Sequence, residues 1–314
     1  MKRPPPPPVP TDREILEPTP APARGVISWN MNTSCNYRCS YCTQRFMDDR
    51  GRWARDVPRF IEAFGRLPGP WEVKMSGGEP FVHPQFLEIV TALAALEFRI
   101  SVVTNFSAKR STLEAFVDAA GPHLGVVSCS LHLEYVSITD DPAARDTLSD
   151  FIARAQWVQS RLPSTGSVCV TCVATRTNLP TLAALRARFD AAGLVFKVQP
   201  HKRDREVIEY APHERQQLVQ LGGHNLTGSI APDFGGQPCW AGSKYFIVDD
   251  RGLAFRCYPA RRYRVERMGN LLDDGFALAD GPTPCRYRYC NCTVPISRGM
   301  MPRPAAHDAA LARP

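Results

Sequence analysis

The sequence predicts an α/β protein whose core is an open, TIM-like partial barrel of six β/α units, followed by a small cysteine-rich β-hairpin domain. Six short apolar runs of β type alternate with helical runs between about residues 25 and 200. This alternation is typical of a parallel sheet with right-handed crossovers. A closed eight-stranded barrel needs two further units, and none is found after Pro200. Two β-type runs around Asp249-Asp250-Arg251-Gly252 indicate the hairpin.

Each expected strand is rich in β-branched or aromatic residues, and each expected helix repeats its apolar residues with a helical period. The strands are expected at Val26–Met31, Glu72–Met75, Ile100–Thr104, Val126–Leu131, Ser167–Ala174 and Leu194–Val198. The helices are expected at Val57–Leu67, Pro84–Leu96, Thr112–Ala120, Pro142–Leu162 and Thr181–Ala192. The hairpin strands are expected at Lys244–Val248 and Leu253–Arg256.

Length and composition bound the domain organisation. With 314 residues, 44% of them hydrophobic, the chain can form one large domain with an appendage. We expect a disordered Pro-rich tail at 1–24, the barrel at 25–225, the cysteine-rich domain at 232–296 and a flexible tail at 297–314.

The sequence also indicates which partners to expect. No segment approaches the roughly 20 apolar residues of a membrane span, and the N-terminus has no apolar stretch typical of a signal peptide. We therefore expect a cytoplasmic protein without a membrane partner. The net charge of +7 is spread along the chain, and without a basic helix or an aromatic-studded stripe it does not indicate a nucleic-acid partner.

A loop after the first expected strand carries Cys35-Asn-Tyr-Arg-Cys39-Ser-Tyr-Cys42. Clustered cysteines in a reducing compartment are more often metal ligands than disulfides. Three thiolates can hold three corners of a cubane iron–sulfur cluster and leave one iron open for a substrate or cofactor. The next cysteine is Cys129, so none lies nearby to close the site. A zinc knuckle, or cysteines clustered by chance, is the alternative.

The second expected strand ends in Ser-Gly77-Gly78-Glu79-Pro80. Functional residues of parallel barrels lie at the carboxyl ends of the strands, and glycines there let the backbone approach a ligand closely. The carbonyl groups and Glu79 can accept hydrogen bonds from an ammonium group. The alternative is an ordinary Gly-Pro turn.

Polar residues also end the third, fourth and fifth expected strands. They are Asn105, Ser130 with His132, and Arg176 with Asn178. The forked donors of Arg176 suit a carboxylate. Asn105 as a turn residue and His132 as a structural histidine are the alternatives.

Five more cysteines form a second group, at Cys239, Cys257, Cys285, Cys290 and Cys292. The hairpin can bring Cys239 and Cys257 together at its base. A zinc ribbon is the alternative to a cluster site here. Between the two groups, Cys129, Cys169 and Cys172 are expected to be small buried side chains. Cys169 and Cys172 lie three apart on a strand and therefore point to opposite faces.

The run Cys-x3-Cys-x-aromatic-Cys, with Tyr41 as the aromatic residue, together with Gly77–Pro80 on the next strand, resembles the radical S-adenosylmethionine (radical SAM) superfamily over about residues 25–200. The second cysteine group resembles the Twitch or SPASM extension of such enzymes. Five cysteines rather than seven favour a Twitch-type domain with one [4Fe–4S] cluster. Its implied ligands are Cys239, Cys257, Cys290 and one of Cys285 and Cys292, because the spacing of the last three departs from the family pattern.

The resemblance implies a radical SAM enzyme. Cys35, Cys39 and Cys42 would hold a [4Fe–4S] cluster, and Gly77, Gly78, Glu79 and Pro80 would cradle the amino group of SAM. Ribose and carboxylate contacts would come from Asn105, Ser130, His132, Arg176 and Asn178. Reductive cleavage of SAM would give a 5′-deoxyadenosyl radical that abstracts a hydrogen atom from the substrate, with an electron donor such as flavodoxin or ferredoxin.

Residues 1–24 are too short and Pro-rich for a winged-helix peptide-recognition domain. The sequence therefore favours a small-molecule or sugar substrate that is oxidised, epimerised or similarly changed. The alternative is a maturase that modifies a ribosomal peptide. A non-catalytic zinc or iron–sulfur scaffold or sensor is the alternative from another class, but a scaffold has no need of Gly77–Pro80.

Overall fold

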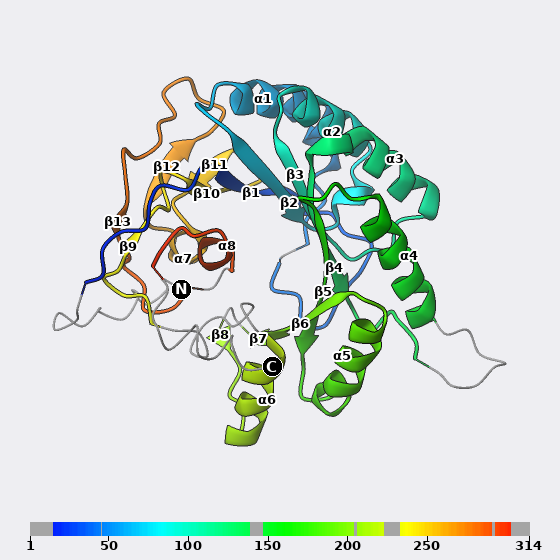
Figure 1. The fold of residues 1–314 in the computed structure, drawn as a ribbon. Helices are drawn as coiled ribbons and strands as arrows, with labels where there is room; N and C mark the ends of the chain where they lie inside the picture. Colours follow the sequence, from blue (N-terminus) through cyan, green and yellow to red (C-terminus); the bar gives the residue numbers. More distant parts are fainter. Residues whose placement is uncertain are drawn as a thin grey trace.

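The computed structural model describes residues 15–44, 46–138, 147–203, 206–222, 233–290 and 293–302. Six parallel strands alternate with five helices in its first part (Figure 1). The strands are β1 (Gly25–Asn32), β2 (Trp71–Gly77), β3 (Arg99–Thr104), β4 (Leu124–Leu131), β5 (Ser167–Ala174) and β6 (Val195–Pro200). The helices are α1 (Trp53–Gly65), α2 (Phe86–Ala95), α3 (Arg110–Ala120), α4 (Thr147–Arg161) and α5 (Leu182–Ala191). All expected strands and helices of the barrel are therefore confirmed, with ends that shift by a few residues; the expected start of the fourth helix lies outside the described residues.

The C-terminal part continues the same sheet. Strand β10 (Tyr245–Val248) forms the expected hairpin with β11 (Leu253–Phe255), and β12 (Arg267–Asn270) pairs with β11. Strand β10 also pairs in parallel with β1, with Val26 opposite Tyr245. The described residues thus form one nine-stranded sheet in the order β12-β11-β10-β1-β2-β3-β4-β5-β6. No sequence pattern indicated this, because pairing between strands more than 200 residues apart leaves no local signal.

Besides short 3-10 turns, the structure has one further helix of 11 residues and several shorter elements. They are β7 (Lys202–Arg203), β8 (Glu206–Val207), α6 (Pro212–Gly222), β9 (Pro238–Cys239), α7 (Tyr258–Tyr263), β13 (Thr283–Pro284) and α8 (Val294–Ser297). Figure 1 shows α1 to α5 on the outer side of the curved sheet and α7 and α8 toward its concave side. Strands β9 and β13 pair with each other.

The two faces of the barrel strands differ in character, as strand alternation requires. The outer face packs under the helices and forms the main hydrophobic core; its residues include Ile27, Val73, Ile100, Val127 and Val170. Burying each such side chain contributes about 1.5–3 kcal/mol. The concave face is polar and half-exposed; its residues include Ser28, Lys74, Ser128, Thr171 and Lys197. The barrel thus has a packed outside and a polar inner face.

The described part of the N-terminal segment lies against the C-terminal region. The indole N–H of Trp240 donates to the carbonyl of Thr19 at 2.8 Å, and the hydroxyl of Thr19 donates to the carbonyl of Gly299 at 3.0 Å. Residues 1–14 of the expected disordered tail lie outside the described residues. From Ile15 onward, these hydrogen bonds attach the chain to the C-terminal region. None of the helices in the described ranges is long and apolar enough to cross a bilayer.

Candidate active site

The cysteine loop begins where β1 ends, at the carboxyl edge of the sheet. Asp49 closes the loop: its carboxylate accepts from the backbone N–H of Thr33 and the hydroxyl of Ser34, both at 2.7 Å. Although burial opposes it, these hydrogen bonds keep the pKa of Asp49 below its ordinary value. Asp49 is therefore a charged clamp at the base of the loop, and no local sequence pattern predicted it.

The loop is docked on the ends of two other strands. The amide of Asn105, just after β3, donates to the side-chain oxygen of Asn36 at 2.8 Å. The ring of Tyr37 stacks on that of Tyr135, after β4, with centroids 3.9 Å apart. These contacts join residues about 70 and 100 positions apart, so only the folded barrel brings them together. They hold the loop over the mouth of the barrel.

The three thiols differ in their surroundings. Cys35 and Cys39 are half-buried and Cys42 is exposed. The Sγ atom of Cys39 lies 3.3 Å from Nδ1 of His132, and the hydroxyl of Tyr41 lies 2.8 Å from the same nitrogen. The amide of Asn105 approaches Sγ of Cys35 at 3.9 Å. The expected residues Asn105, His132 and Tyr41 are thus brought to the thiols.

The raised pKa values of the Cys35 and Cys39 thiols fit a site that needs metal cations to stabilise the thiolates. Burial, together with Glu134 and the other two thiols, raises the pKa of Cys39 to about 12. Thiolates of this kind need a metal cation to become stable. In the ranges that the structure describes, no three His, Cys, Asp or Glu side chains are gathered closely enough to hold a metal ion.

Two glycines let the end of β2 lie directly against the start of the cysteine loop. Gly77 has φ of +136°, and a Cβ there would lie 2.2 Å from the carbonyl oxygen of Asn32. A Cβ on Gly78 would lie 1.9 Å from the carbonyl oxygen of Ser34. The backbone N–H of Gly78 donates to the Asn32 carbonyl at 2.9 Å. Any side chain at either position would separate the two segments.

The carboxylate of Glu79 accepts hydrogen bonds from groups of the protein itself. Its side chain is 1% exposed, and its carboxylate accepts from the hydroxyl of Thr104 at 2.7 Å and from the backbone N–H groups of Asn105 and Phe81 at 2.6 and 3.1 Å. Burial raises its pKa to about 7 against the lowering effect of these donors. The side chain ties the β2 turn to the end of β3. A role of the Gly77–Pro80 backbone toward SAM stays a prediction. Pro80 begins a short 3-10 turn.

The residues after β5 are not brought to the cysteine loop by any contact in the described chain. The amide of Asn178 donates to the carbonyl of Val173 at 2.9 Å and closes its own turn. The guanidinium of Arg176 donates to the carbonyl of Glu209 at 2.6 Å and is exposed. Ser130 is half-exposed on the concave face of β4. A role of these three residues toward SAM stays a prediction.

Two of the three isolated cysteines are buried as expected. Cys129 and Cys172 lie in the main core. Cys169 is half-exposed on the concave face, so the expectation that it is buried was wrong. Cys169 and Cys172 do point to opposite faces of β5, because a regular strand alternates its side chains.

The second cysteine group is assembled from separate segments. Cys239 on β9, Cys257 after β11 and Cys290 are buried in one apolar cluster, and Cys285 packs against it. Burial, together with the thiol of Cys239, raises the pKa of Cys285 to about 12. Cys285 thus lies with the other three. Cys292, the other candidate for the fourth ligand, lies outside the described residues.

Arg256 holds these segments together. Its side chain is buried, with 8% of the residue exposed, and its guanidinium donates to the carbonyls of Ala241 at 2.9 Å and Thr283 at 2.8 Å, and to Glu266 at 3.0 Å. It also reaches the carbonyl of Cys239 at 3.5 Å. The planar fork of arginine suits such multiple contacts. One buried cation therefore fixes the strands that carry or flank the C-terminal cysteines.

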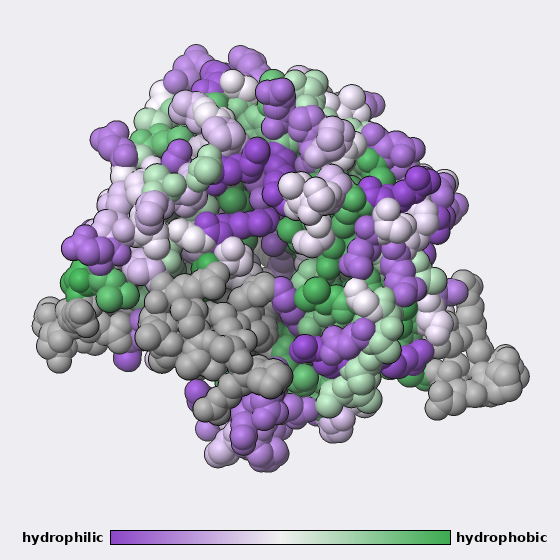
Figure 2. Space-filling model, viewed as in Figure 1, coloured by the Kyte–Doolittle hydropathy of each residue, from purple (hydrophilic) through white to green (hydrophobic). Residues whose placement is uncertain are grey.

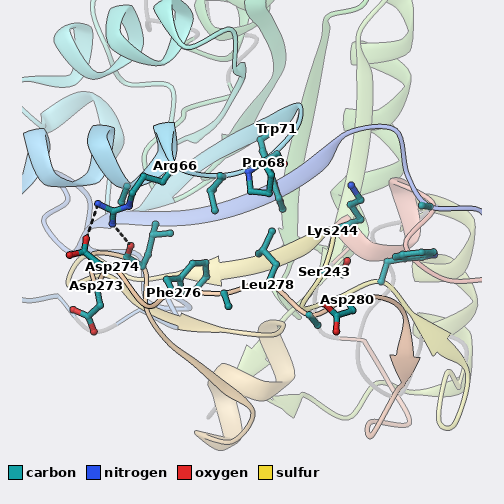
Figure 3. Close-up of a pocket in the computed structure, with 17 residues that line it drawn as sticks. Arg66, Pro68, Trp71, Ser243, Lys244, Asp273, Asp274, Phe276, Leu278 and Asp280 are labelled. Atoms are coloured by element: carbon teal, nitrogen blue, oxygen red, sulfur yellow. Dashed lines mark hydrogen bonds and ion pairs between the residues drawn. The ribbon is translucent and has the colours of Figure 1, made fainter.

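A separate cavity of about 700 Å³ lies at the opposite ends of the strands (Figure 3). Trp71 at the start of β2 and Lys244 just before β10 line it, with Phe276 and Leu278 from the C-terminal segment. Figure 3 shows Arg66 directed at Asp274, with which it pairs at 3.5 Å. Because it lies at the amino ends of β2 and β10, this cavity is remote from the cysteine loop.

Comparison with known proteins agrees with this geometry. The model of the Radical SAM superfamily matches residues 29–177. The mycofactocin maturase MftC of Mycobacterium tuberculosis is 28% identical over 274 residues, covering 79% of this chain and 68% of that protein. A probable GTP 3′,8-cyclase of Thermococcus kodakarensis is 32% identical over 106 residues, covering 33% of each.

Solved structures share the fold. Streptococcus suis SuiB bound to precursor peptide SuiA has a TM-score of 0.52 at 14% identity, over 82% of this chain; this chain spans only 65% of SuiB. Native anSMEcpe with bound AdoMet and a Cp18Cys peptide has a TM-score of 0.51 at 15% identity, over 80% of this chain and 78% of that one. The α/β fold with a mostly parallel central sheet is thus confirmed. With the superfamily match over the strands that carry the cysteine loop and Gly77–Pro80, the chain is a radical SAM superfamily enzyme, whose cofactors are a [4Fe–4S] cluster and S-adenosylmethionine.

Proposed function

We propose that this chain is a radical SAM peptide maturase with one auxiliary [4Fe–4S] cluster. The observation that carries the proposal is the extent of the similarity to MftC, which covers 79% of the chain and therefore runs well beyond the radical SAM domain. The cyclase match covers only 33% of the chain, so it reports on less of the molecule. The preference for a small-molecule substrate is not confirmed, and the peptide alternative fits the relatives better.

Cys35, Cys39 and Cys42 would hold the first cluster, and the backbone of Gly77–Pro80 would face the amino group of SAM. When bound, cluster and SAM supply the one-electron chemistry that cleaves SAM. The protein's own contribution is placement. Asp49 clamps the base of the loop, and the Tyr37–Tyr135 stack holds its middle. Glu79 fixes the turn that lies beneath it. An electron donor such as flavodoxin or ferredoxin would deliver the electron.

The C-terminal region would be a Twitch-like domain. Its ligands would be Cys239, Cys257, Cys285 and Cys290, since the first, second and fourth belong to one buried apolar cluster and Cys285 packs against it. Arg256 would act as a positioning residue, because it fixes the segments that carry or flank three of them. A cluster there would need all four thiols deprotonated, and a buried guanidinium beside them favours that state.

The test is anaerobic turnover with short peptides encoded beside the gene, each made with deuterated amino acids. A maturase transfers deuterium into 5′-deoxyadenosine and changes the mass of one peptide. The proposal fails if a deuterated sugar or nucleotide labels 5′-deoxyadenosine while every peptide keeps its mass.

A further inference from the structure

The cavity at the amino ends of β2 and β10 has apolar and aromatic walls. Its lining includes the rings of Trp71, Trp240 and Phe276 and the side chains of Pro68 and Leu278. Trp240 and Phe276 are half-exposed, so their rings can contact a ligand. In Figure 3, Phe276 and Leu278 lie between two groups of charged residues at the ends of the cavity. The volume of about 700 Å³ lies within the range of roughly 300–1,000 Å³ that is typical of ligand sites.

One wall of the cavity is a loop that is held at both ends. The loop, residues 271–280, follows β12 and contains no helix or strand. The guanidinium of Arg66 donates to the carbonyl of Leu271 at 3.4 Å and pairs with Asp274 at 3.5 Å. Toward the other end, the backbone N–H of Ala279 donates to the carbonyl of Gly242 at 3.0 Å. The cavity is therefore preformed, because a ligand does not have to order this wall.

The charged residues of the cavity favour a basic ligand. The loop contributes three carboxylates, Asp273, Asp274 and Asp280, and the two cations in the lining are Arg66 and Lys244. Arg66 pairs with Asp274. Within the described ranges, no side-chain hydrogen bond or ion pair engages Asp273, Asp280 or Lys244, and both of these aspartates are exposed. Two free carboxylates and one free ammonium group leave an excess of negative charge. A cation would also be attracted by the aromatic faces.

A proline-rich segment with basic residues matches these walls. Polyproline II segments bind in aromatic-lined grooves, and they lose little conformational entropy because the helix is preformed. Near its N-terminus the chain has a basic pair, Lys2 and Arg3, followed directly by five prolines, a valine and a sixth proline. The prolines suit the rings of Trp240 and Phe276, and the basic pair suits the carboxylates of the loop. Residues 2–10 lie outside the described residues.

The described N-terminal segment passes close enough for residues 2–10 to reach the cavity. The backbone N–H of Leu16 donates to the side chain of Gln237 at 3.0 Å, and Ala21 lines the cavity. Ala21 is five positions after Leu16 and Pro10 is six positions before it. At about 3.4 Å per residue these stretches span at most about 17 and about 20 Å. Ile15 is 59% exposed, and Figure 2 shows a hydrophobic patch at the left edge, where the described chain begins in Figure 1. The chain before Leu16 is therefore long enough to return to the cavity.

We propose that this cavity binds the proline-rich segment of the same chain, residues 2–10, as a polyproline II helix. The prolines would pack on Trp240 and Phe276, and the basic pair would interact with the carboxylates of the loop. Because the segment is tethered, its effective concentration at the cavity is on the order of 1 mM. An intrinsic Kd of about 0.1 mM would then leave only about one segment in eleven undocked. Docking would brace the loop that leads to Cys285.

The test is photo-cross-linking of the full-length protein that carries Val9→p-benzoylphenylalanine, a change that leaves every proline in place. Irradiation followed by peptide mass spectrometry should locate the cross-link on the walls of the cavity, at Trp240, Phe276 or Leu278. A mixture of isotope-labelled and unlabelled protein shows whether one chain or two are joined. We expect cross-links within one chain. Cross-links that fall mainly outside the cavity overturn the proposal, as do cross-links that join two chains, because a second copy would then be the occupant.

Matched variants separate binding from chance proximity. Pro4→Ser, Pro6→Ser and Pro8→Ser together should lower the cross-link yield at least ~10-fold, because they remove the polyproline II helix. Phe276→Ala should have an effect of the same size. Val195→Ala is the control, because it shortens an exposed apolar side chain on β6; it should leave the yield unchanged. An unchanged yield in the triple proline variant overturns the proposal.

Peptide titration gives a second measurement that does not depend on altering the cavity. A synthetic peptide with the sequence of residues 2–10 should bind the triple proline variant at least ~10-fold more tightly than the wild type, whose own segment competes. Replacing the basic pair of the peptide by glutamates should weaken binding about three-fold. Equal binding of the peptide by the two proteins overturns the proposal. Equally tight binding of a peptide whose prolines are replaced alternately by leucine and alanine also overturns it, because the cavity would then be a general apolar site.

Discussion

The two groups of cysteines are built in opposite ways. Cys35, Cys39 and Cys42 lie within eight consecutive residues on one loop, partly open to solvent. The C-terminal cysteines come from separate segments and are gathered in an apolar cluster around the buried guanidinium of Arg256. The first group is thus specified by local sequence, and the second by tertiary packing. The first leaves room for a ligand, whereas the second encloses its thiols, as expected for an open and a closed metal site.

The largest effect that separates the two groups is expected from Cys257→Ala. Removing a buried ligand should eliminate the auxiliary cluster, so the chain should lose about half of its iron. Product formation should fall at least ~10-fold, while SAM cleavage should stay within about three-fold of wild type. Iron analysis and 5′-deoxyadenosine assays measure both. Arg256→Gln should behave similarly, and Arg267→Gln, on an exposed residue of the same region, should not. Equal iron in Cys257→Ala and wild type would contradict a cluster there.

The next-largest effect concerns the stability of the part of the molecule that carries the cysteine loop. Burial raises the pKa of Glu79 from 4.5 to about 7, so the folded state binds a proton more tightly than the unfolded state. The stabilisation of the folded state by the protonated carboxyl of Glu79 is complete below pH 4.5 and is lost as the pH rises to about 7. The loss is about 3 kcal/mol in the free energy of unfolding, since one pKa unit corresponds to about 1.4 kcal/mol.

Urea unfolding at pH 5 and pH 7.5 measures this loss. Glu79→Gln cannot titrate and should show a flatter pH dependence than the wild type. Identical pH dependence in the two proteins would show that Glu79 is already ionised in the folded state.

The smallest effect is expected at the aromatic stack that holds the loop. Tyr135→Ala removes the ring against Tyr37 and the hydroxyl that accepts from the backbone N–H of Arg38 at 2.7 Å. An aromatic pair contributes about 1 kcal/mol, so KM for SAM should rise roughly five-fold with kcat little changed. Tyr135→Phe keeps the ring and should recover most of the loss. A fall in kcat at constant KM would instead place Tyr135 in the chemistry.

The same contrast explains how much could be predicted from the sequence. The strands and helices followed from periodicity, and the cysteine loop and Gly77–Pro80 followed from spacing. Residues that act through long-range contacts left no such pattern: Asp49, Tyr135 and Arg256 look like ordinary polar or aromatic residues. The parallel pairing of β10 with β1 could not be predicted for the same reason. The sequence placed Glu79 correctly at the end of the second strand, but it did not predict that the carboxylate accepts hydrogen bonds from groups of the protein itself.

The substrate was the weakest inference because cofactor motifs specify how the radical chemistry starts and not which molecule it acts on.

The most direct measurement is 5′-deoxyadenosine formation by the reduced, anaerobic enzyme. Cys35→Ala, Cys39→Ala and Cys42→Ala should each reduce it to background, at least ~100-fold, because three thiolates are needed to hold a cluster with one open iron. Cys129→Ala, which removes a core thiol away from the loop, should retain activity. Formation of 5′-deoxyadenosine at the wild-type rate by any of the three loop variants would contradict the assignment of the loop as the site of SAM cleavage.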